Sequence, residues 1–131
     1  IAKIEGVNAI TDVTGFGLGG HLVEVCLASQ VSAKLTFSTI PLLDNIEHYL
    51  DLGCIPGGSE RNFQSYGHQL DKLGETQKAI ICDPQTSGGL LVTVSQSAKS
   101  VVREILEQQQ LSFAEIGEIC PIESQLKIVS F

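Results

Sequence analysis

The sequence predicts one layered α/β (α+β) domain, in which helices pack on a mixed, mostly antiparallel sheet of about four to five strands. Segments with helical periodicity alternate with short apolar runs, and glycine- and proline-rich turns separate them. A length of 131 residues fits a single domain, and an apolar content of 43% is sufficient for one hydrophobic core. No internal repeat, low-complexity tract or linker divides the chain.

The first third of the chain predicts a strand, a helix and a second strand. Residues 7–12 form a short strand that leads into a glycine-rich turn. Residues 33–37 alternate between apolar and polar side chains, as a half-buried strand does. Between them, residues 17–30 predict a helix whose apolar face carries Leu18, Leu22, Val25 and Cys26.

The middle of the chain gives weaker signals. A short helix is expected over residues 44–51 with Asp44 as its N-cap, and the glycines and proline of residues 53–58 indicate a turn. Residues 59–73 are polar with few apolar anchors, which fits either a loop or a short helix. Residues 76–82 are compatible with a helix or a strand.

The last third predicts a buried strand, a helix and two closing strands. Residues 89–94 are rich in branched side chains and predict the buried strand. A helix capped by Ser97 is expected over residues 97–110, and its apolar face comprises Val101, Val102, Ile105, Leu106 and Gln109. Residues 113–120 and 125–131 are expected to be strands, compatible with a hairpin around the turn that joins them.

Composition excludes several classes of function. The net charge is −7, and the eight basic residues are scattered, so no basic stripe is available for nucleic acid. No apolar run approaches the roughly 20 residues of a membrane span. The four cysteines form no C-x-x-C pair, and no secretory signal precedes them, which favours free thiols in a reducing cytoplasm. Because the chain contains no Met, we expect it to be an internal piece of a longer protein.

Residues 11–21 (TDVTGFGLGGH) have the features of an anion site. Glycines let backbone approach a ligand closely, and a helix N-terminus offers unpaired N–H groups and a positive dipole end. Together these features are typical of phosphate binding. Gly15, Gly17 and Gly20 formally match the dinucleotide fingerprint, but no acid follows about 20 residues on, so we reject that interpretation. No Lys follows the glycines as a P-loop requires.

Asp12 is the most informative residue of this segment. A carboxylate beside a phosphate site repels the ligand unless a cation lies between them, and Mg²⁺ is the usual cation. One carboxylate is a poor magnesium site alone, so further ligands are expected from the substrate or from another segment. An equally weighted alternative is that Asp12 caps the turn through the amides of Thr14 or Gly15. His21 is expected to be a structural histidine rather than a ligand or base.

Two further segments could contribute to a site. Residues 83–89 (DPQTSGG) offer hydroxyls, an amide side chain and two glycines that can form a nest of donors, although a tight turn is slightly favoured. Residues 56–62 (PGGSERN) could be a mobile lid that places Arg61 or Asn62 against a ligand. An ordinary exposed loop is the favoured interpretation of this last segment.

The three motifs together resemble those of the selenophosphate synthetase family, and they occur in the same order and at the same spacing. They are T-D-V-T-G-F-G at residues 11–17, P-G-G with R-N at residues 56–62, and D-P-Q-T-S-G-G at residues 83–89. The chain closely resembles the bacterial selenide, water dikinases, and the resemblance runs over essentially its whole length. It implies the C-terminal domain of the aminoimidazole ribonucleotide synthetase-like fold, and residues 1–131 would be that single domain.

The family's reaction converts ATP, selenide and water to selenophosphate, AMP and phosphate, requires Mg²⁺ and occurs in the cytoplasm. The resemblance implies that Asp12 is a magnesium ligand. It also implies a set of residues that face the nucleotide phosphates: Thr14, Gly15, Gly17, Thr86, Ser87, Gly88 and Gly89. The catalytic Cys or selenocysteine and an essential Lys belong to an N-terminal half that is absent here, so no catalytic residue is assigned and the fragment is expected to be inactive alone. The partners implied are that N-terminal domain and a second copy in a homodimer. Gly19 departs from the family pattern, where a larger apolar residue is common.

Two alternatives remain open from the sequence. One is a sibling ATP-dependent synthetase or dehydratase domain of the same superfamily, whose equivalent motifs differ from D-P-Q-T-S-G-G. The other is a non-catalytic ligand-binding or assembly module, which composition does not exclude.

Overall fold

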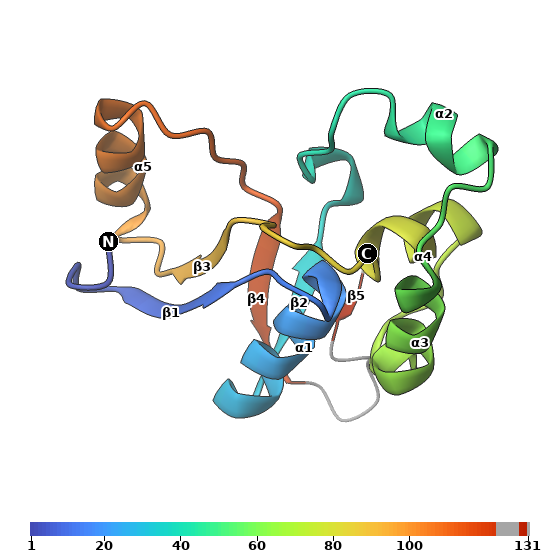
Figure 1. The fold of residues 1–131 in the computed structure, drawn as a ribbon. Coiled ribbons are helices and arrows are strands. Elements are labelled where there is room, and N and C mark those ends of the chain that lie inside the picture. Colours follow the sequence, from blue (N-terminus) through green and yellow to red (C-terminus); the bar gives the residue numbers. More distant parts are fainter. Residues whose placement is uncertain (123–128, 131) are drawn as a thin grey trace.

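The computed structural model describes residues 1–122 and 129–130 and confirms the α+β fold class (Figure 1). The elements follow in the order β1 (Val7–Asp12), α1 (Gly17–Ser29), β2 (Val31–Leu35), the 3-10 helix η1 (Phe37–Thr39), α2 (Ile46–Asp51), α3 (Gly57–Tyr66), the 3-10 helix η2 (Gly67–Gln69), α4 (Glu75–Ile81), β3 (Leu90–Val94), α5 (Lys99–Gln108), β4 (Gly117–Pro121) and β5 (Val129–Ser130).

The described strands divide between two sheets. β1 and β3 pair antiparallel, with Asp12 opposite Leu90 and Ile10 opposite Val92. β2 is the middle strand of the second sheet, with β4 antiparallel on one side and β5 parallel on the other. The hairpin considered for the two closing strands is therefore wrong, because β2 lies between them. Residues 125–128 and 131 of that prediction lie outside the described residues.

Helix α1 is the centre of the core. It packs against β2 and β5 as well as α3 and α4, and Figure 1 shows it between the β1–β3 pair and the two helices. Leu22, Val23 and Cys26 of α1 are buried, which confirms its predicted apolar face at two of four positions. Removing each large apolar side chain from water stabilises the fold by roughly 1.5–3 kcal/mol. The core is completed by Val13, Ala33, Leu35, Tyr66, Leu70, Ile81, Cys82, Leu91 and Val129.

The boundaries of several elements differ from the predicted ones. β2 begins and ends two residues earlier than the predicted strand at residues 33–37. The polar stretch at residues 59–73 is largely helical, because α3 and η2 continue to Gln69, and the ambiguous segment at 76–82 is the helix α4. In a short helix with a polar exposed face, the few buried positions give only a weak periodic signal in the sequence.

Both predicted N-caps are wrong. Helix α2 has Asn45 as its N-cap residue, in a left-handed conformation, and no side-chain cap hydrogen bond is formed. Helix α5 has Ala98 as its N-cap residue, and the hydroxyl of Ser97 instead bonds that of Ser95 at 3.0 Å. Asp44 lies one residue before the cap of α2. Local sequence identifies residue types that suit a cap, but the path of the chain decides which one occupies it.

Strand β3, which was predicted at residues 89–94 as a buried strand, is only partly buried. Within β3, Leu91 is buried, whereas Leu90 is 65% exposed. The β1–β3 pair, with α5 and the N-terminus beside it, lies on one side of the molecule, away from α3 and α4 (Figure 1). Helix α5 fully buries Val102 alone; Ile105 and Leu106 are half-buried and Val101 is 46% exposed, so its predicted apolar face is only partly covered. Within the described ranges, no helix is long and apolar enough to cross a membrane.

Candidate phosphate and metal site

The antiparallel pairing of β1 and β3 brings two of the three sequence motifs together. The first loop (residues 13–16) follows β1, and the second loop (residues 83–89) precedes β3. The ladder continues into these loops: Val13 N–H donates to Gly89 O at 2.9 Å, and Gly88 N–H donates to Val13 O at 3.0 Å. Gln85 N–H donates to Thr14 O at 3.1 Å. Segments about 70 residues apart in sequence therefore form one continuous surface.

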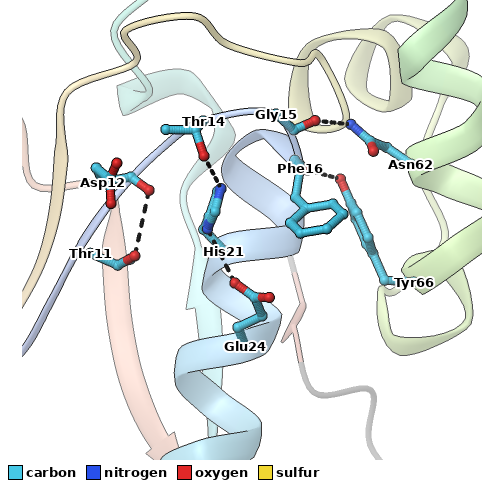
Figure 2. A network of polar contacts seen from close by, with 9 residues as sticks. All are labelled: Thr11, Asp12, Thr14, Gly15, Phe16, His21, Glu24, Asn62 and Tyr66. Atoms are coloured by element: carbon cyan, nitrogen blue, oxygen red, sulfur yellow. Dashed lines mark hydrogen bonds and ion pairs between the residues drawn. The ribbon is translucent and has the colours of Figure 1, made fainter.

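Helix α3 carries most of the third motif and contacts the other two; Figure 2 shows its contacts with the first loop. Asn62 Nδ2 donates to Gly15 O in the first loop at 2.8 Å and to Cys82 O, just before the second loop, at 2.9 Å. The hydroxyl of Tyr66 donates to Phe16 O at 2.5 Å. The interpretation of this motif as a mobile lid or an exposed loop is wrong for Asn62, which is buried in a helix. Arg61 is exposed on the same helix.

Gly17 and Gly88 allow the two loops to approach each other. Gly17 has φ +71°, and a Cβ placed on it would lie 2.7 Å from Asp83 O. A Cβ on Gly88 would lie 2.7 Å from Val13 O. The amides of both glycines are already used, because Gly17 N–H donates to Thr14 O and Gly88 N–H to Val13 O. These two residues therefore shape the surface and do not supply free donors.

The first loop presents amides without partners among the described residues: those of Thr14, Gly15 and Phe16. The preceding carbonyls are all held: Val13 O by Gly88 N–H, Thr14 O by the amides of Gly17 and Gln85, and Gly15 O by Asn62. In a trans peptide the C=O and the N–H point in opposite directions, so each free N–H points away from its anchored carbonyl. The second loop likewise has unpartnered amides at Thr86, Ser87 and Gly89, which are exposed.

Asp12 ends β1 beside these amides and is exposed. Within the described part of the chain, no hydrogen bond or ion pair involves its carboxylate; the 3.4 Å contact from the Thr11 hydroxyl reaches only its main-chain oxygen (Figure 2). The alternative in which Asp12 caps the turn through Thr14 or Gly15 is therefore wrong. No group of three or more His, Cys, Asp or Glu residues able to hold a metal occurs among residues 1–122 and 129–130. Any cation at Asp12 would take its other ligands from outside this set.

The Asp83 side chain forms a hydrogen bond within its own loop. Gln85 Nε2 donates to Asp83 Oδ2 at 2.6 Å, and burial raises the pKa of the Asp83 carboxyl above its ordinary value. This local hydrogen bond agrees with the tight turn that the sequence favoured for residues 83–89. Asp12, rather than Asp83, is thus the carboxylate available to a ligand at this surface.

His21 connects the first loop to α1 (Figure 2). Its Nε2 lies 3.1 Å from the Thr14 hydroxyl, and its Nδ1 lies 3.2 Å from Glu24 Oε2 without the alignment of a hydrogen bond. The ring is buried and tilted against that of Phe16, with centroids 5.9 Å apart. These contacts agree with a structural histidine that supports the loop from behind.

Two hollows of the molecule lie elsewhere. One of about 570 Å³ is bounded by the N-terminal segment and the start of α5, including Gly6 and Val101. A smaller one, of about 90 Å³, lies between α3 and α4 and includes Ser59 and Lys78. Neither includes a residue of the two loops, so the candidate site is an exposed surface on which one side of a ligand would rest.

The fold and the two joined loops define an α+β domain with an exposed loop surface. Residues 1–125 match the family described as AIR synthase related protein, C-terminal domain, and the chain belongs to this family.

The relatives of the chain confirm the family resemblance that the three motifs predicted. The chain is 51% identical over 98% of its length to a selenide, water dikinase of Shewanella baltica, and 55% identical over 91% to one of Shewanella sp. strain ANA-3. It spans only 37% and 34% of these two relatives. Among solved structures, a thiamine-monophosphate kinase from Stenotrophomonas maltophilia K279a has the same fold, with a TM-score of 0.57 at 16% identity. That match covers 95% of this chain and 31% of the kinase.

Sequence reasoning missed the role of Tyr66. Tyr66 and Asn62 are four residues apart, so on a helix they lie on one face. A helical interpretation of residues 57–66 would have placed both side chains toward the same neighbour. That signal was present in the spacing, but the polar composition of the segment favoured a loop.

Proposed function

We propose that this chain is the magnesium- and phosphate-binding C-terminal domain of a selenide, water dikinase. The complete protein would convert ATP, selenide and water to selenophosphate, AMP and phosphate. The observation that carries the proposal is an exposed Asp12 carboxylate that has no partner among the described residues, beside two loops that each present several amides without a partner in the same part of the chain. Similarity over nearly the whole chain to proteins named selenide, water dikinase supports it.

The charges of this surface suit a metal-bridged phosphate. Amide N–H groups favour an anion, whereas the Asp12 carboxylate repels one unless a divalent cation neutralises both. Asp12 would hold Mg²⁺, which would offset charge on the phosphate oxygens. The amides of Thr14, Gly15, Phe16, Thr86, Ser87 and Gly89 would donate to those oxygens, and Gly17 and Gly88 would keep the loops close enough to do so.

Other parts of the proposal concern the complete protein. The single carboxylate and the share of the relatives that the chain spans fit a site completed by an N-terminal domain. We place the enzyme in the cytoplasm as a homodimer and expect residues 1–131 alone to have no turnover. ATP-dependent formation of selenophosphate by the 131-residue chain would refute the last point.

Calorimetry on the full-length protein tests the magnesium site. Wild type should bind ADP more tightly with Mg²⁺ than without it. In Asp12→Asn the affinity for ADP in the presence of Mg²⁺ should fall roughly tenfold or more, as metal affinity does when a ligand or its support is removed. Asp44→Asn, which removes an exposed carboxylate before α2, should bind like wild type. Equal magnesium dependence in wild type and Asp12→Asn would contradict the assignment.

A second measurement tests the reaction. The full-length protein should release AMP from ATP only when selenide is present. AMP release without selenide, or none with it, would favour a sibling synthetase or dehydratase. If even the full-length protein shows no magnesium-dependent nucleotide binding, a non-catalytic module would be the better conclusion.

A further inference from the structure

We infer that Asn62 is a positioning residue that sets the geometry of both loops of the proposed phosphate site, with Tyr66 as its companion. The expected effect on ligand binding rests on the proposed function. The role of Asn62 in placing the two loops rests on contacts within the chain alone. Asn62 is 8% exposed, lies on α3 and touches neither Asp12 nor any exposed amide directly.

A single side-chain nitrogen of Asn62 links two distant segments. Nδ2 carries two N–H groups, and both have an acceptor: Gly15 O at 2.8 Å and Cys82 O at 2.9 Å. The first acceptor belongs to the first loop. The second is the C-cap residue of α4, directly before the second loop. This planar amide group therefore holds the two loops together at this end, in addition to the bond from Gln85 N–H to Thr14 O.

The bond to Gly15 O also directs a donor. The Gly15 carbonyl and the Phe16 N–H belong to one trans peptide, so holding the carbonyl toward α3 turns the Phe16 N–H away from α3. Tyr66 fixes the next carbonyl, that of Phe16, from the same helix. Without these two bonds, rotation of the Gly15–Phe16 peptide would redirect the Phe16 N–H. No other hydrogen bond among the described residues holds Gly15 O.

The glycines on either side make this control necessary. Gly15 and Gly17 bracket Phe16, and a Cβ on Gly15 would meet nothing within 4 Å. Glycine leaves the backbone more conformations than other residues, so the loop requires external bonds to keep one of them. Asn62 and Tyr66 supply these bonds from a helix whose own position is fixed by packing of Gly58 on Pro84 and of Tyr66 on Gly20.

The test uses the full-length protein with three variants and a matched control. Asn62→Asp keeps the shape but replaces the donor Nδ2 by an acceptor oxygen that faces two carbonyl oxygens, Asn62→Ala removes the group, and Tyr66→Phe removes only the hydroxyl. Val102→Ala shortens a buried side chain on α5, on the opposite side of the molecule, and controls for loss of stability.

Two readouts separate positioning from stability. Loss of folded protein lowers the number of active sites, which lowers apparent kcat and leaves the KM for ATP unchanged. Misplaced loops should raise the KM for ATP, or the Kd for Mg·ADP, by roughly ten- to a hundredfold in the Asn62 variants and less in Tyr66→Phe. Amide hydrogen exchange should accelerate in the same variants at the hydrogen-bonded amides of the loops, those of Val13, Gly17, Gln85 and Gly88, and stay unchanged in Val102→Ala.

The outcomes distinguish the inference from the proposed function. If wild type binds Mg·ADP and the Asn62 variants bind it equally well, Asn62 is merely structural and the inference is wrong. The inference is also overturned if exchange in the two loops is unchanged. If wild type binds no Mg·ADP but the loops of the variants exchange faster, the positioning role holds and the proposed function fails.

Discussion

Replacing Gly17 with Ala tests whether the approach of the two loops is as close as the structure indicates. Two penalties apply. A left-handed backbone conformation costs a residue with a Cβ about 1–2 kcal/mol, and Gly17 has φ +71°. The new Cβ would also lie 2.7 Å from Asp83 O and 2.9 Å from Ile81 O, both backbone atoms that cannot rotate away. Overpacking of this kind costs about 1–3 kcal/mol, so the sum is about 2–5 kcal/mol.

Three other glycines separate the two penalties. Gly53 has φ +75° and open space around its Cβ position, so Gly53→Ala should show the conformational penalty alone. Gly88 lacks a left-handed φ, but its Cβ would lie 2.7 Å from Val13 O, so Gly88→Ala should show the steric penalty alone. Gly15→Ala carries neither and should stay within about 0.5 kcal/mol of wild type.

Urea denaturation of the four variants measures these differences in the free energy of unfolding. The expected order of destabilisation places Gly17→Ala first, Gly53→Ala and Gly88→Ala between, and Gly15→Ala last. If Gly17→Ala is no more destabilising than Gly53→Ala, the second loop does not approach Gly17 as closely as described, and the site geometry built on that approach is wrong.

Two further predictions concern ionisable groups. Cys54 is exposed, whereas Cys26 and Cys82 are buried, and burial raises the pKa of Cys26 to about 11 and that of Cys82 in the same direction. A thiol reagent at mildly alkaline pH should therefore modify Cys54 rapidly and the two buried thiols only after unfolding; rapid reaction of Cys26 in folded protein would argue against this packing. Because burial raises the folded-state pKa of Asp83, the folded state binds that proton more readily than the unfolded state does. The contribution of Asp83 to stability should thus grow as pH falls through its folded-state pKa and level off below the unfolded value, about 3.9. Urea midpoints over this range should show the gain in wild type and not in Asp83→Asn; equal slopes would contradict it.

The sequence by itself determined the elements whose signals are local. Helix α1 is evident from the spacing of its apolar residues, and β1 from a short run before a glycine turn. The three motifs also identified the family, because their residue types and order are properties of the chain alone. Asp12 was recognised as unusual for a similarly local reason: an acid stood where a strand meets a glycine-rich turn.

Only the tertiary structure decided how these pieces meet. The pairing of β1 with β3 depends on hydrogen bonds between residues about 80 apart, and no local pattern specifies that register. The position of β2 between β4 and β5 has the same origin, since a strand sequence does not state which neighbour it pairs with. Asn62 gave no sign of its two carbonyl partners, because an amide on a polar helix looks like a solvated side chain until distant backbone is placed against it. Periodicity indicates which face of an element is apolar. The hydrogen bonds that assemble this surface involve main-chain groups distant in sequence, and periodicity carries no information about them.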